Sequence, residues 1–377
     1  MTLGLYTHIP FCRGKCSYCH FISFQFNPSL AARYHNAVLK EIESADLAGG
    51  RFEEVDTIYF GGGTPTLIPD THIRDVLDEF RRKFRIKNDC EISIEANPGT
   101  LSKRKIAALR THGVNRISLG AQSFDDQELA SIGRLHTRDM IFAVLNQLKL
   151  CGFQNVNLDL MLGLPYQTDK SWKLNLEILV QLEIPHISIY MLDLDDNCPL
   201  SNVVASGSVP LPEEDLIADM YLDAVHLLSS KGYKQYEISN FAQPGYACQH
   251  NLKYWRRQPV LGFGLASHSF DGSARFANQS DMNAYLAAAE NGYSPVLWRE
   301  EIGLTQEFQE TIFLGLRLTE GLDCDQLKTR YGEDAVSALV RNLQDLSAQG
   351  FVRIEGGRIL LTPSAMLVSN EIFQQFV

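Results

Sequence analysis

Apolar residues follow two alternating periods over residues 53–241, after a first strand-like run, GLYTHI, near the start. Short runs rich in β-branched and other apolar residues predict buried strands, and stretches in which apolar residues recur about every 3.6 positions predict helices. The strand runs are VDTIYF, EISIEA, NRISLG, NVNLDLM, HISIYML and QYEISNF. The helical stretches are 73–84, 103–111, 138–150, 171–182 and 213–230. This alternation predicts an α/β fold of roughly six or seven βα units, arranged as a partial β/α barrel.

Four of the predicted strands run directly into polar or glycine-containing turns. These turns are residues 61–66, 95–100, 120–124 and 159–163. In parallel α/β architectures the carboxyl ends of the strands meet at one mouth, where ligands bind. The pattern therefore predicts a ligand site built from these four turns.

The pattern changes after residue 240. Residues 241–300 are less regular, because Gly, Pro, Asn and Trp interrupt any period. Residues 301–377 contain three helical stretches followed by GFVRIEGGRILLT, which predicts a hairpin around a Gly-Gly turn. We therefore expect three segments: a barrel over 1–240, a connecting segment over 241–300, and a mainly helical, winged-helix-like domain over 301–377.

The charge of the chain argues against nucleic-acid binding. The formal net charge is −11, whereas a protein that binds nucleic-acid phosphates shows basic stripes. In residues 301–377, six Lys or Arg residues stand against eleven Asp or Glu residues, which gives −5 and is the wrong sign for DNA. The winged-helix-like domain is therefore expected to serve packing or to act as a lid.

Composition predicts a cytoplasmic protein. Of the 377 residues, 45% are apolar and 21% are charged, as in an ordinary globular chain. No run approaches the roughly 18 apolar residues of a membrane-spanning helix, and the opening residues MTLGLYTHIP lack the features of a signal peptide. In a reducing compartment thiols stay free, so clustered cysteines are expected to bind metal rather than to form disulfides.

Three of the eight cysteines lie close together, in the segment FCRGKCSYCHF. Cys12, Cys16 and Cys19 have the spacing C-x3-C-x2-C, which lets three thiolates converge on one centre. A structural zinc site needs a fourth ligand, which His8 or His20 could supply. A [4Fe-4S] cluster has four irons, so three cysteines leave one iron open to a small ligand. Ligand chemistry favours the cluster and leaves zinc as the alternative.

The cysteine spacing, followed by a strand that ends in GGGTPT, resembles the radical S-adenosylmethionine (SAM) superfamily. In that superfamily the amino and carboxylate groups of SAM chelate the open iron, so the resemblance implies a [4Fe-4S] cluster on Cys12, Cys16 and Cys19. Further blocks resemble the coproporphyrinogen dehydrogenase-like branch, and within it the HemW-type haem chaperones. These blocks are LYTHIPFC, YFGGGTPT, IEANPGT, LGAQSFDDQELASIGRLHT, NLDLMLGLPYQT, YEISNFA and HNLKYW. They occur in order over nearly the whole chain and are followed by the winged-helix-like segment, so the resemblance implies a partial β/α barrel of the radical SAM type with a C-terminal, mainly helical domain.

The resemblance also implies which residues hold the methionine end of SAM. It places Gly62, Gly63 and Thr64 there, where glycine lets the backbone approach a ligand closely. It places Glu95 on the ammonium group and Arg134 on the carboxylate, because a planar guanidinium suits a planar anion. The methionine end would thus lie between two side chains of opposite charge.

Three further residues belong to the same implied site. Gln122 and Asp159 match positions on the ribose hydroxyl groups, where amide and carboxylate oxygens accept hydrogen bonds. Tyr6 matches a tyrosine beside that pocket. HemW-type sequences usually have Asp directly after the third cysteine, whereas this chain has His20, whose effect the sequence leaves open.

Two functions are compatible with such a cluster. One is oxygen-independent coproporphyrinogen III dehydrogenase, in which a radical made from SAM abstracts hydrogen from porphyrinogen propionates. The other is a chaperone that binds haem and delivers it to haem-requiring respiratory proteins. The dehydrogenase resembles C-x3-C-x2-C-x-C, but Phe21 stands at the place of its fourth cysteine. The HNLKYW block matches the H-N-x-x-Y-W motif associated with haem binding in HemW-type proteins, and both features favour the chaperone.

The implied haem-binding residues are His250, Asn251, Tyr254 and Trp255. Imidazole is a common axial ligand of haem iron, and aromatic rings can flank a flat macrocycle. We therefore expect a haem chaperone rather than a coproporphyrinogen dehydrogenase, and leave open whether SAM is cleaved. The expected partners are haem and haem-requiring respiratory enzymes, with at most transient membrane contact and no nucleic acid, and a homodimer is left open.

Overall fold

The computed structural model describes residues 2–45, 54–194 and 198–376. The chain forms two compact units that alternate along the sequence. The first contains Met1–Glu213 and Gln258–Glu301, and the second contains Glu214–Arg257 and Ile302–Val377. The sequence pattern divides the chain differently, into the consecutive segments 1–240, 241–300 and 301–377, and that division stays a prediction. Within the described residues, no helix is both long enough and apolar enough to cross a membrane.

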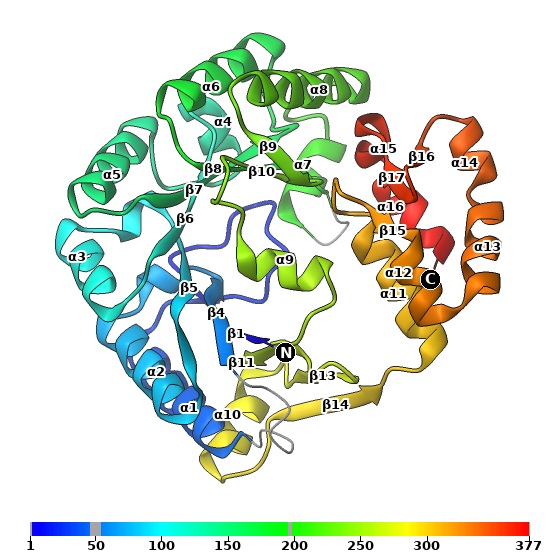
Figure 1. Ribbon diagram of the computed structural model, residues 1–377. Coiled ribbons are helices and arrows are strands. Elements are labelled where there is room, and N and C mark those ends of the chain that lie inside the picture. Colours follow the sequence, from blue (N-terminus) through cyan, green and yellow to red (C-terminus); the bar gives the residue numbers. More distant parts are fainter. Residues whose placement is uncertain (1, 46–53, 195–197, 377) are drawn as a thin grey trace. The chain divides into compact units, whose positions relative to one another are not determined.

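A mostly parallel sheet forms the centre of the first unit (Figure 1). Its parallel strands, in spatial order, are β11 (Val260–Phe263), β1 (Thr2–Ile9), β4 (Glu54–Gly62), β5 (Ile86–Ala96), β6 (Arg116–Gln122), β7 (Asn155–Leu162) and β8 (His186–Met191). The helices between them in sequence are α1 (Pro28–Ser44), α2 (Asp70–Lys83), α3 (Lys103–His112), α4 (Asp126–Ser131), α5 (Arg138–Leu150), α6 (Asp169–Gln181) and α7 (Pro199–Ala205). The predicted α/β fold with a parallel sheet is confirmed.

The strands of this sheet are largely buried because both of their faces are covered. All residues of β6 are buried, and so is the run Cys90–Ile94 in β5. Helices α2, α3, α5 and α6 lie along the outer side of the strands (Figure 1). Leu77 and Phe80 of α2 are fully buried, as expected for a helix with one apolar face. Strands covered in this way read as β-branched and apolar runs instead of alternating ones.

The register of the parallel strands brings their polar carboxyl ends to one edge. Glu95 at the end of β5 pairs with Ser118 of β6, and Gly120 of β6 pairs with Asp159 of β7. Short 3-10 turns follow two strands, at Pro65–Leu67 after β4 and at Pro98–Thr100 after β5. The residues expected to form the ligand site therefore lie on neighbouring strands.

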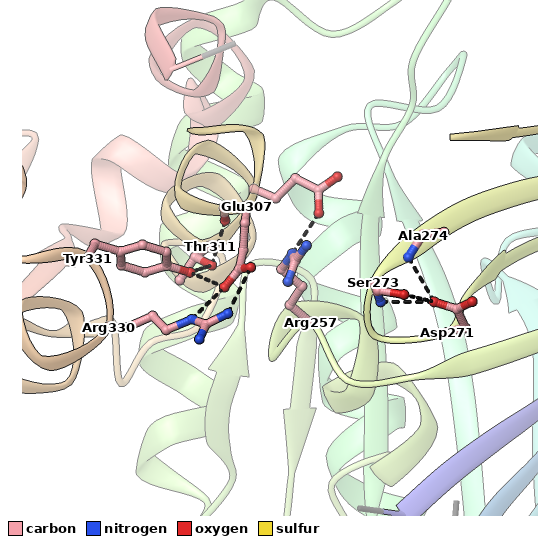
Figure 2. Close-up of polar contacts among 9 residues, drawn as sticks. Arg257, Asp271, Ser273, Ala274, Glu307, Thr311, Arg330 and Tyr331 are labelled. Carbon is pink, nitrogen blue, oxygen red and sulfur yellow. Dashed lines mark hydrogen bonds and ion pairs between the residues drawn. The ribbon is translucent and has the colours of Figure 1, made fainter. Parts of the chain in front are cut away.

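An antiparallel extension of the sheet follows β11. Strands β12 (His268–Phe270), β13 (Ala274–Asn278) and β14 (Val296–Glu301) pair one after another from β11, and α10 (Met282–Glu290) lies between β13 and β14 in sequence. Oδ1 of Asp271 accepts hydrogen bonds from the backbone N–H groups of Ser273 and Ala274 and closes the turn before β13 (Figure 2). The sequence pattern does not predict these strands, because β12 and β13 are short and β14 is mostly exposed and lacks a long apolar run.

The second unit combines helices with a small hairpin and a three-stranded sheet. Its first part contains α8 (Glu214–Ser230), β9 (Lys234–Glu237), β10 (Asn240–Ala242) and α9 (Gln249–Trp255). Its second part contains α11 (Leu304–Gly315), β15 (Leu322–Asp323), α12 (Cys324–Tyr331), α13 (Glu333–Asn342), α14 (Gln344–Ala348), β16 (Val352–Glu355), β17 (Arg358–Leu361), α15 (Pro363–Leu367), α16 (Ser369–Phe373) and a 3-10 turn, Gln374–Phe376. Strands β16 and β17 form the predicted hairpin, with Gly356 and Gly357 both at positive φ.

The prediction of one strand for QYEISNF is wrong. Residues 235–241 contain parts of two antiparallel strands, β9 and β10, joined by a tight turn. Oε1 of Glu237 accepts hydrogen bonds from the backbone N–H of Ser239 and the side-chain amide of Asn240. This local bonding closes a turn inside a run whose apolar residues look continuous.

Ion pairs connect the helices of the second unit (Figure 2). Arg257, just after α9, donates through Nε to a carboxylate oxygen of Glu310 on α11 over 2.7 Å. Arg330 of α12 pairs with Glu307 of α11 over 2.9 Å, and Tyr331 donates its hydroxyl to the same carboxylate over 3.0 Å. These contacts hold α12 and the end of α9 against α11.

Candidate functional site

The three clustered cysteines lie in the loop between β1 and α1. Strands β2 (Phe11–Cys12) and β3 (Phe24–Gln25) pair in parallel and close the base of this loop. Farther along the loop, Tyr18 packs against a buried apolar cluster that includes Ile132, and the backbone N–H of Ser17 donates to the carbonyl oxygen of Ile132 over 3.2 Å. The loop is therefore anchored at its base and at its centre.

All three cysteines of the loop are half-buried and line one cavity. Sγ of Cys12 lies 3.6 Å from Oγ1 of Thr64, and Nη1 of Arg134 donates to Sγ of Cys16 over 3.7 Å. Burial raises the pKa of the Cys19 thiol, and the nearby Cys16 and Cys12 raise it further. Among the described residues, no three His, Cys, Asp or Glu side chains stand close enough together to hold one metal ion. The cysteines are free and line one cavity, and a metal centre on Cys12, Cys16 and Cys19 stays a prediction.

A cavity of about 390 Å³ opens beside the cysteine loop, at the carboxyl ends of the strands. Its walls include the three cysteines and most of the residues that the resemblance assigns to SAM. The latter are Gly62, Gly63, Thr64, Glu95, Gln122, Arg134 and Asp159. Ligand pockets typically measure roughly 300–1,000 Å³, so this cavity is large enough for a small cofactor.

The glycine segment at the end of β4 requires glycine at two positions. A Cβ atom on Gly63 would lie 2.8 Å from the carbonyl oxygen of Phe11 and 3.0 Å from Sγ of Cys12. Gly62 has a φ of 117°, and a Cβ atom there would lie 2.7 Å from the ring of His8. Because a side chain fits at neither position, glycine lets the end of β4 lie directly against the first cysteine.

Glu95 stands at the end of β5 with both carboxylate oxygens engaged. Tyr59 donates its hydroxyl to Oε1 over 3.0 Å, and the backbone N–H of Gly62 donates to Oε2 over 3.1 Å. Burial raises the pKa of Glu95 to about 7, the charge of Asp159 also raises it, and the two hydrogen bonds lower it. A cation beside Glu95 would favour the ionised carboxylate, so this side chain suits an ammonium group.

Arg134 links the cysteine loop to the ends of β5 and β6. Its Nη2 donates to Oδ1 of Asn97 over 2.8 Å and to the carbonyl oxygen of Gly120 over 2.5 Å, while Nη1 contacts Cys16. Within the described residues its buried Nε has no hydrogen-bond partner. The guanidinium thus keeps one donor for an acceptor that the described residues do not supply.

Asn97 completes this network and is a residue that the sequence analysis does not identify. Its side-chain amide donates to Oγ1 of Thr64 over 2.9 Å, and Thr64 in turn contacts Cys12. Asn97 therefore connects Arg134 with Thr64 and, through it, with the first cysteine. The signal that could have indicated Asn97 is its position just after the strand that ends near Glu95.

Gln122 is the last residue of β6, and Asp159 lies inside β7. Oε1 of Gln122 is buried without a hydrogen-bond partner in the described part of the chain, and its φ of 70° is unusual for a residue other than glycine. Asp159 accepts a hydrogen bond from the side-chain amide of Asn157 over 2.6 Å, and burial raises its pKa. A buried acceptor left without a donor in a strained conformation indicates that a ligand belongs beside it.

Tyr6 lies on β1, paired with Tyr59 of β4, and is not among the residues that line the cavity. Its hydroxyl is 3.0 Å from Nδ1 of His8, and its ring stacks on Tyr59 at 6.2 Å between centroids. Nε2 of His8 lies 3.4 Å from the carbonyl oxygen of Ile22, near the end of the cysteine loop. Tyr6 therefore contacts β4, and His8 contacts the end of the cysteine loop.

The HNLKYW segment forms α9 in the second unit. His250 is only 1% exposed, and its Nε2 lies 3.1 Å from the hydroxyl of Tyr254. Burial lowers the pKa of His250 to about 3, so its ring is neutral at neutral pH. Tyr254 is 36% exposed, whereas Asn251 and Trp255 are half-buried. The four motif residues share one short helix, and Tyr254 is the exposed one among them.

Comparisons with known proteins agree with this geometry. Residues 6–178 match the family model of the radical SAM superfamily, and residues 304–368 match that of the HemN C-terminal domain. The heme chaperone HemW of Bacillus subtilis is 33% identical over 374 residues, which cover 99% of this chain and 98% of that protein. This chain belongs to the HemW family of radical SAM proteins.

A second HemW protein and one solved structure are also similar to this chain. HemW of Escherichia coli is 37% identical over 267 residues, which cover 71% of this chain and 69% of that protein. Among solved structures, the coproporphyrinogen III oxidase HemN of Escherichia coli matches with a TM-score of 0.85 at 25% identity, over 100% of this chain and 90% of that chain. The HemW-family chain thus has the fold of HemN, and the predicted fold class, with its C-terminal helical domain, is confirmed.

Two residues directly after the third cysteine differ from the expected patterns. Phe21, at the place of the fourth cysteine of the dehydrogenase, is 65% exposed and lines the cavity. His20, at the place of the Asp usual in HemW-type sequences, is exposed, and its Nε2 lies 3.3 Å from the carbonyl oxygen of Asp193. His20 is not among the residues that line the cavity.

Proposed function

We propose that this protein is a haem chaperone that carries a [4Fe-4S] cluster and SAM in its first unit and binds haem through its second unit. The observation that carries the proposal is the similarity to heme chaperone HemW over 99% of the chain. By this proposal the protein delivers haem to haem-requiring respiratory enzymes. A cytoplasmic location, at most transient membrane contact and the lack of nucleic-acid binding stay predictions, and a homodimer stays open.

The donor set of the first unit fits the cluster and SAM. Three cysteines line a cavity that also holds a buried carboxamide oxygen of Gln122 and a buried N–H of Arg134, both without partners within the described residues. SAM would satisfy both, because its ribose hydroxyl groups are donors and its carboxylate is an acceptor. Glu95 would pair with its ammonium group, and Asp159 would accept a hydrogen bond from the ribose.

The chain's own residues would position these groups. When bound, the cluster would supply an electron to the sulfonium of SAM, the chemistry of the superfamily. Asn97 holds Arg134 and Thr64 in one hydrogen-bonded network, and the same network reaches Cys12 and Cys16. The same hydrogen bonds would therefore orient Cys16, which would bind the cluster, and Arg134, which would bind SAM.

One observation favours coproporphyrinogen III dehydrogenase as a second candidate. The match to HemN, a coproporphyrinogen III oxidase, covers the whole of this chain with a TM-score of 0.85. Against this candidate stands Phe21, since its phenyl ring cannot supply a thiolate at the position of the fourth cysteine. The haem-chaperone proposal is therefore preferred.

A paired assay distinguishes the two functions. The anaerobically reconstituted full chain is titrated with haem, followed by absorbance, and a second sample is incubated with coproporphyrinogen III, SAM and a reductant. We expect saturable haem binding and no protoporphyrinogen. Formation of protoporphyrinogen, or a failure to bind haem, would contradict the chaperone proposal.

The raised pKa of Glu95 predicts that SAM binds more weakly at low pH. Glu95 must be ionised to pair with the ammonium group, and with a pKa of about 7 it is mostly protonated at pH 6 and mostly ionised at pH 8. We expect the affinity of the reconstituted protein for SAM to fall about tenfold from pH 8 to pH 6, since one pH unit below a pKa changes the ionised fraction about tenfold. Equilibrium dialysis measures the affinity. Glu95→Gln should bind SAM more weakly and lose this pH dependence, and an unchanged dependence in the variant would assign it to another group.

A further inference from the structure

The HNLKYW helix places its histidine and its tyrosine in different surroundings. His250 is buried, with Nε2 3.1 Å from the hydroxyl of Tyr254, and the two rings meet edge to face at 5.3 Å between centroids. A spacing of four residues puts both side chains on one face of α9. A flat macrocycle has to bring its iron directly onto a ligand atom. A ring nitrogen that is buried and occupied by a tyrosine hydroxyl is poorly placed for that approach.

Tyr254 is the more exposed member of this pair, at 36% against 1% for His250. Its side chain reaches solvent, and its hydroxyl is the group that contacts His250. Tyrosine oxygen is a recognised axial ligand of haem iron, besides histidine, cysteine and methionine. The exposed member of the histidine–tyrosine pair is therefore chemically able to bind the iron.

The residues next to Tyr254 suit the rest of a haem molecule. Trp255 packs against the guanidinium of Arg317 at 4.3 Å, which fixes an aromatic surface beside the tyrosine. Arg256 is exposed and pairs with Glu320 over 3.1 Å. An exposed ion pair of this kind contributes little to stability, so the guanidinium of Arg256 can turn to another carboxylate at small cost. Haem carries two propionate carboxylates.

We propose that Tyr254 binds the haem iron through its oxygen, that His250 positions this oxygen, and that Arg256 pairs with a haem propionate. The inference rests on the proposed haem-binding function and names its iron ligand. When ferric haem binds, a bond forms between the tyrosine oxygen and iron, the O–H bond breaks and the proton leaves to solvent. No electron is transferred. His250 stays within hydrogen-bond distance of the ligand oxygen and keeps it aimed at the iron.

Spectroscopy of the full-length chain loaded with ferric haem tests this proposal. Wild-type protein, Tyr254→Phe, His250→Ala and Tyr246→Phe are compared by resonance Raman and electron paramagnetic resonance, with haem dissociation measured by transfer to excess apomyoglobin. Tyr246 is the matched control, because it packs, like Trp255, against one buried apolar cluster of the same unit. Far-ultraviolet circular dichroism and cluster iron content check that each variant is folded.

The wild type and Tyr246→Phe are expected to show a tyrosinate–iron vibration, and Tyr254→Phe is expected to lose it. Haem should leave Tyr254→Phe at least about tenfold faster, a change equal to roughly 1.4 kcal/mol. His250→Ala should keep the tyrosinate signature while binding haem more loosely. Tyr254→His should show imidazole ligation instead.

Two results would contradict Tyr254 as the iron ligand and leave the proposed haem-chaperone function intact. One is a tyrosinate signature that survives in Tyr254→Phe or in Tyr254→His. The other is a wild-type spectrum of imidazole ligation that His250→Ala abolishes, which would make His250 the ligand. If the wild type binds no haem at all, the proposed haem-chaperone function is wrong too. This result differs from the two above, so the experiment separates a wrong iron ligand from a wrong function.

Discussion

Anaerobically reconstituted Cys16→Ser protein is expected to hold at least about tenfold less iron than the wild type, and to lose SAM binding with it. Cys16 lines the cavity and accepts a hydrogen bond from Arg134. Changes in residues that merely support a metal ligand already cost about 10–100-fold in affinity, and a serine hydroxyl is a much poorer iron ligand than a thiolate. Iron analysis and the absorbance of the cluster measure the loss.

Cys151→Ser is the matched control for this experiment. Cys151 caps the end of α5, is half-buried like Cys16, and does not line the cavity. Its replacement should leave iron content and SAM affinity unchanged. Full iron content in Cys16→Ser, together with full SAM affinity, would show that the cluster is not held as proposed.

Glu41→Ala is expected to lower the free energy of unfolding of the first unit by about 3 kcal/mol or more. Glu41 lies on α1 and is 7% exposed. Its carboxylate accepts hydrogen bonds from the backbone N–H of Gly264 over 2.8 Å, the hydroxyl of Tyr285 over 2.6 Å and the side-chain amide of Asn278 over 2.5 Å. Each buried donor left without a partner costs about 1–3 kcal/mol. Urea unfolding of the cluster-free protein, followed by circular dichroism, measures the difference.

The exposed Glu43 on the same helix provides the control. Its carboxylate lies 3.7 Å from Arg82 in a pair that is largely exposed, and such pairs contribute about 0–1 kcal/mol. Glu43→Ala should therefore change the midpoint of unfolding little. If Glu41→Ala unfolds at the same urea concentration as Glu43→Ala, the carboxylate does not tie α1 to the segment after β11.

The sequence predicts the central sheet well because one physical feature dominates it. Parallel strands covered on both faces read as apolar runs, and the helices between them keep a clear period. The stretch 138–150, for example, forms α5 from Arg138 to Leu150. Short or mostly exposed strands lack this signal, so the antiparallel strands β12, β13 and β14 are not predicted. The side-chain bonds of Glu237 split a run that looks like one strand.

The cavity residues are found because they follow predicted strands and match a family pattern. Residues that belong to the site only through their side-chain hydrogen bonds are harder to predict from the sequence. Asn97 belongs to the network because of two hydrogen bonds that no spacing reveals. Tyr6 lies on β1 next to Tyr59 of β4 and does not line the cavity, and a motif match does not reveal this. The burial of His250 depends on how α9 packs in its unit, which a motif match cannot tell.

Haem transfer is the most direct test of the proposed function. Reconstituted, haem-loaded protein is mixed with haem-depleted membranes that contain a haem-requiring respiratory enzyme, and the enzyme's haem content and activity are followed against the same concentration of free haem. The proposal predicts that the loaded protein loses its haem and restores the enzyme faster than free haem does. Restoration no faster than with free haem, while the haem stays on the protein, would contradict it.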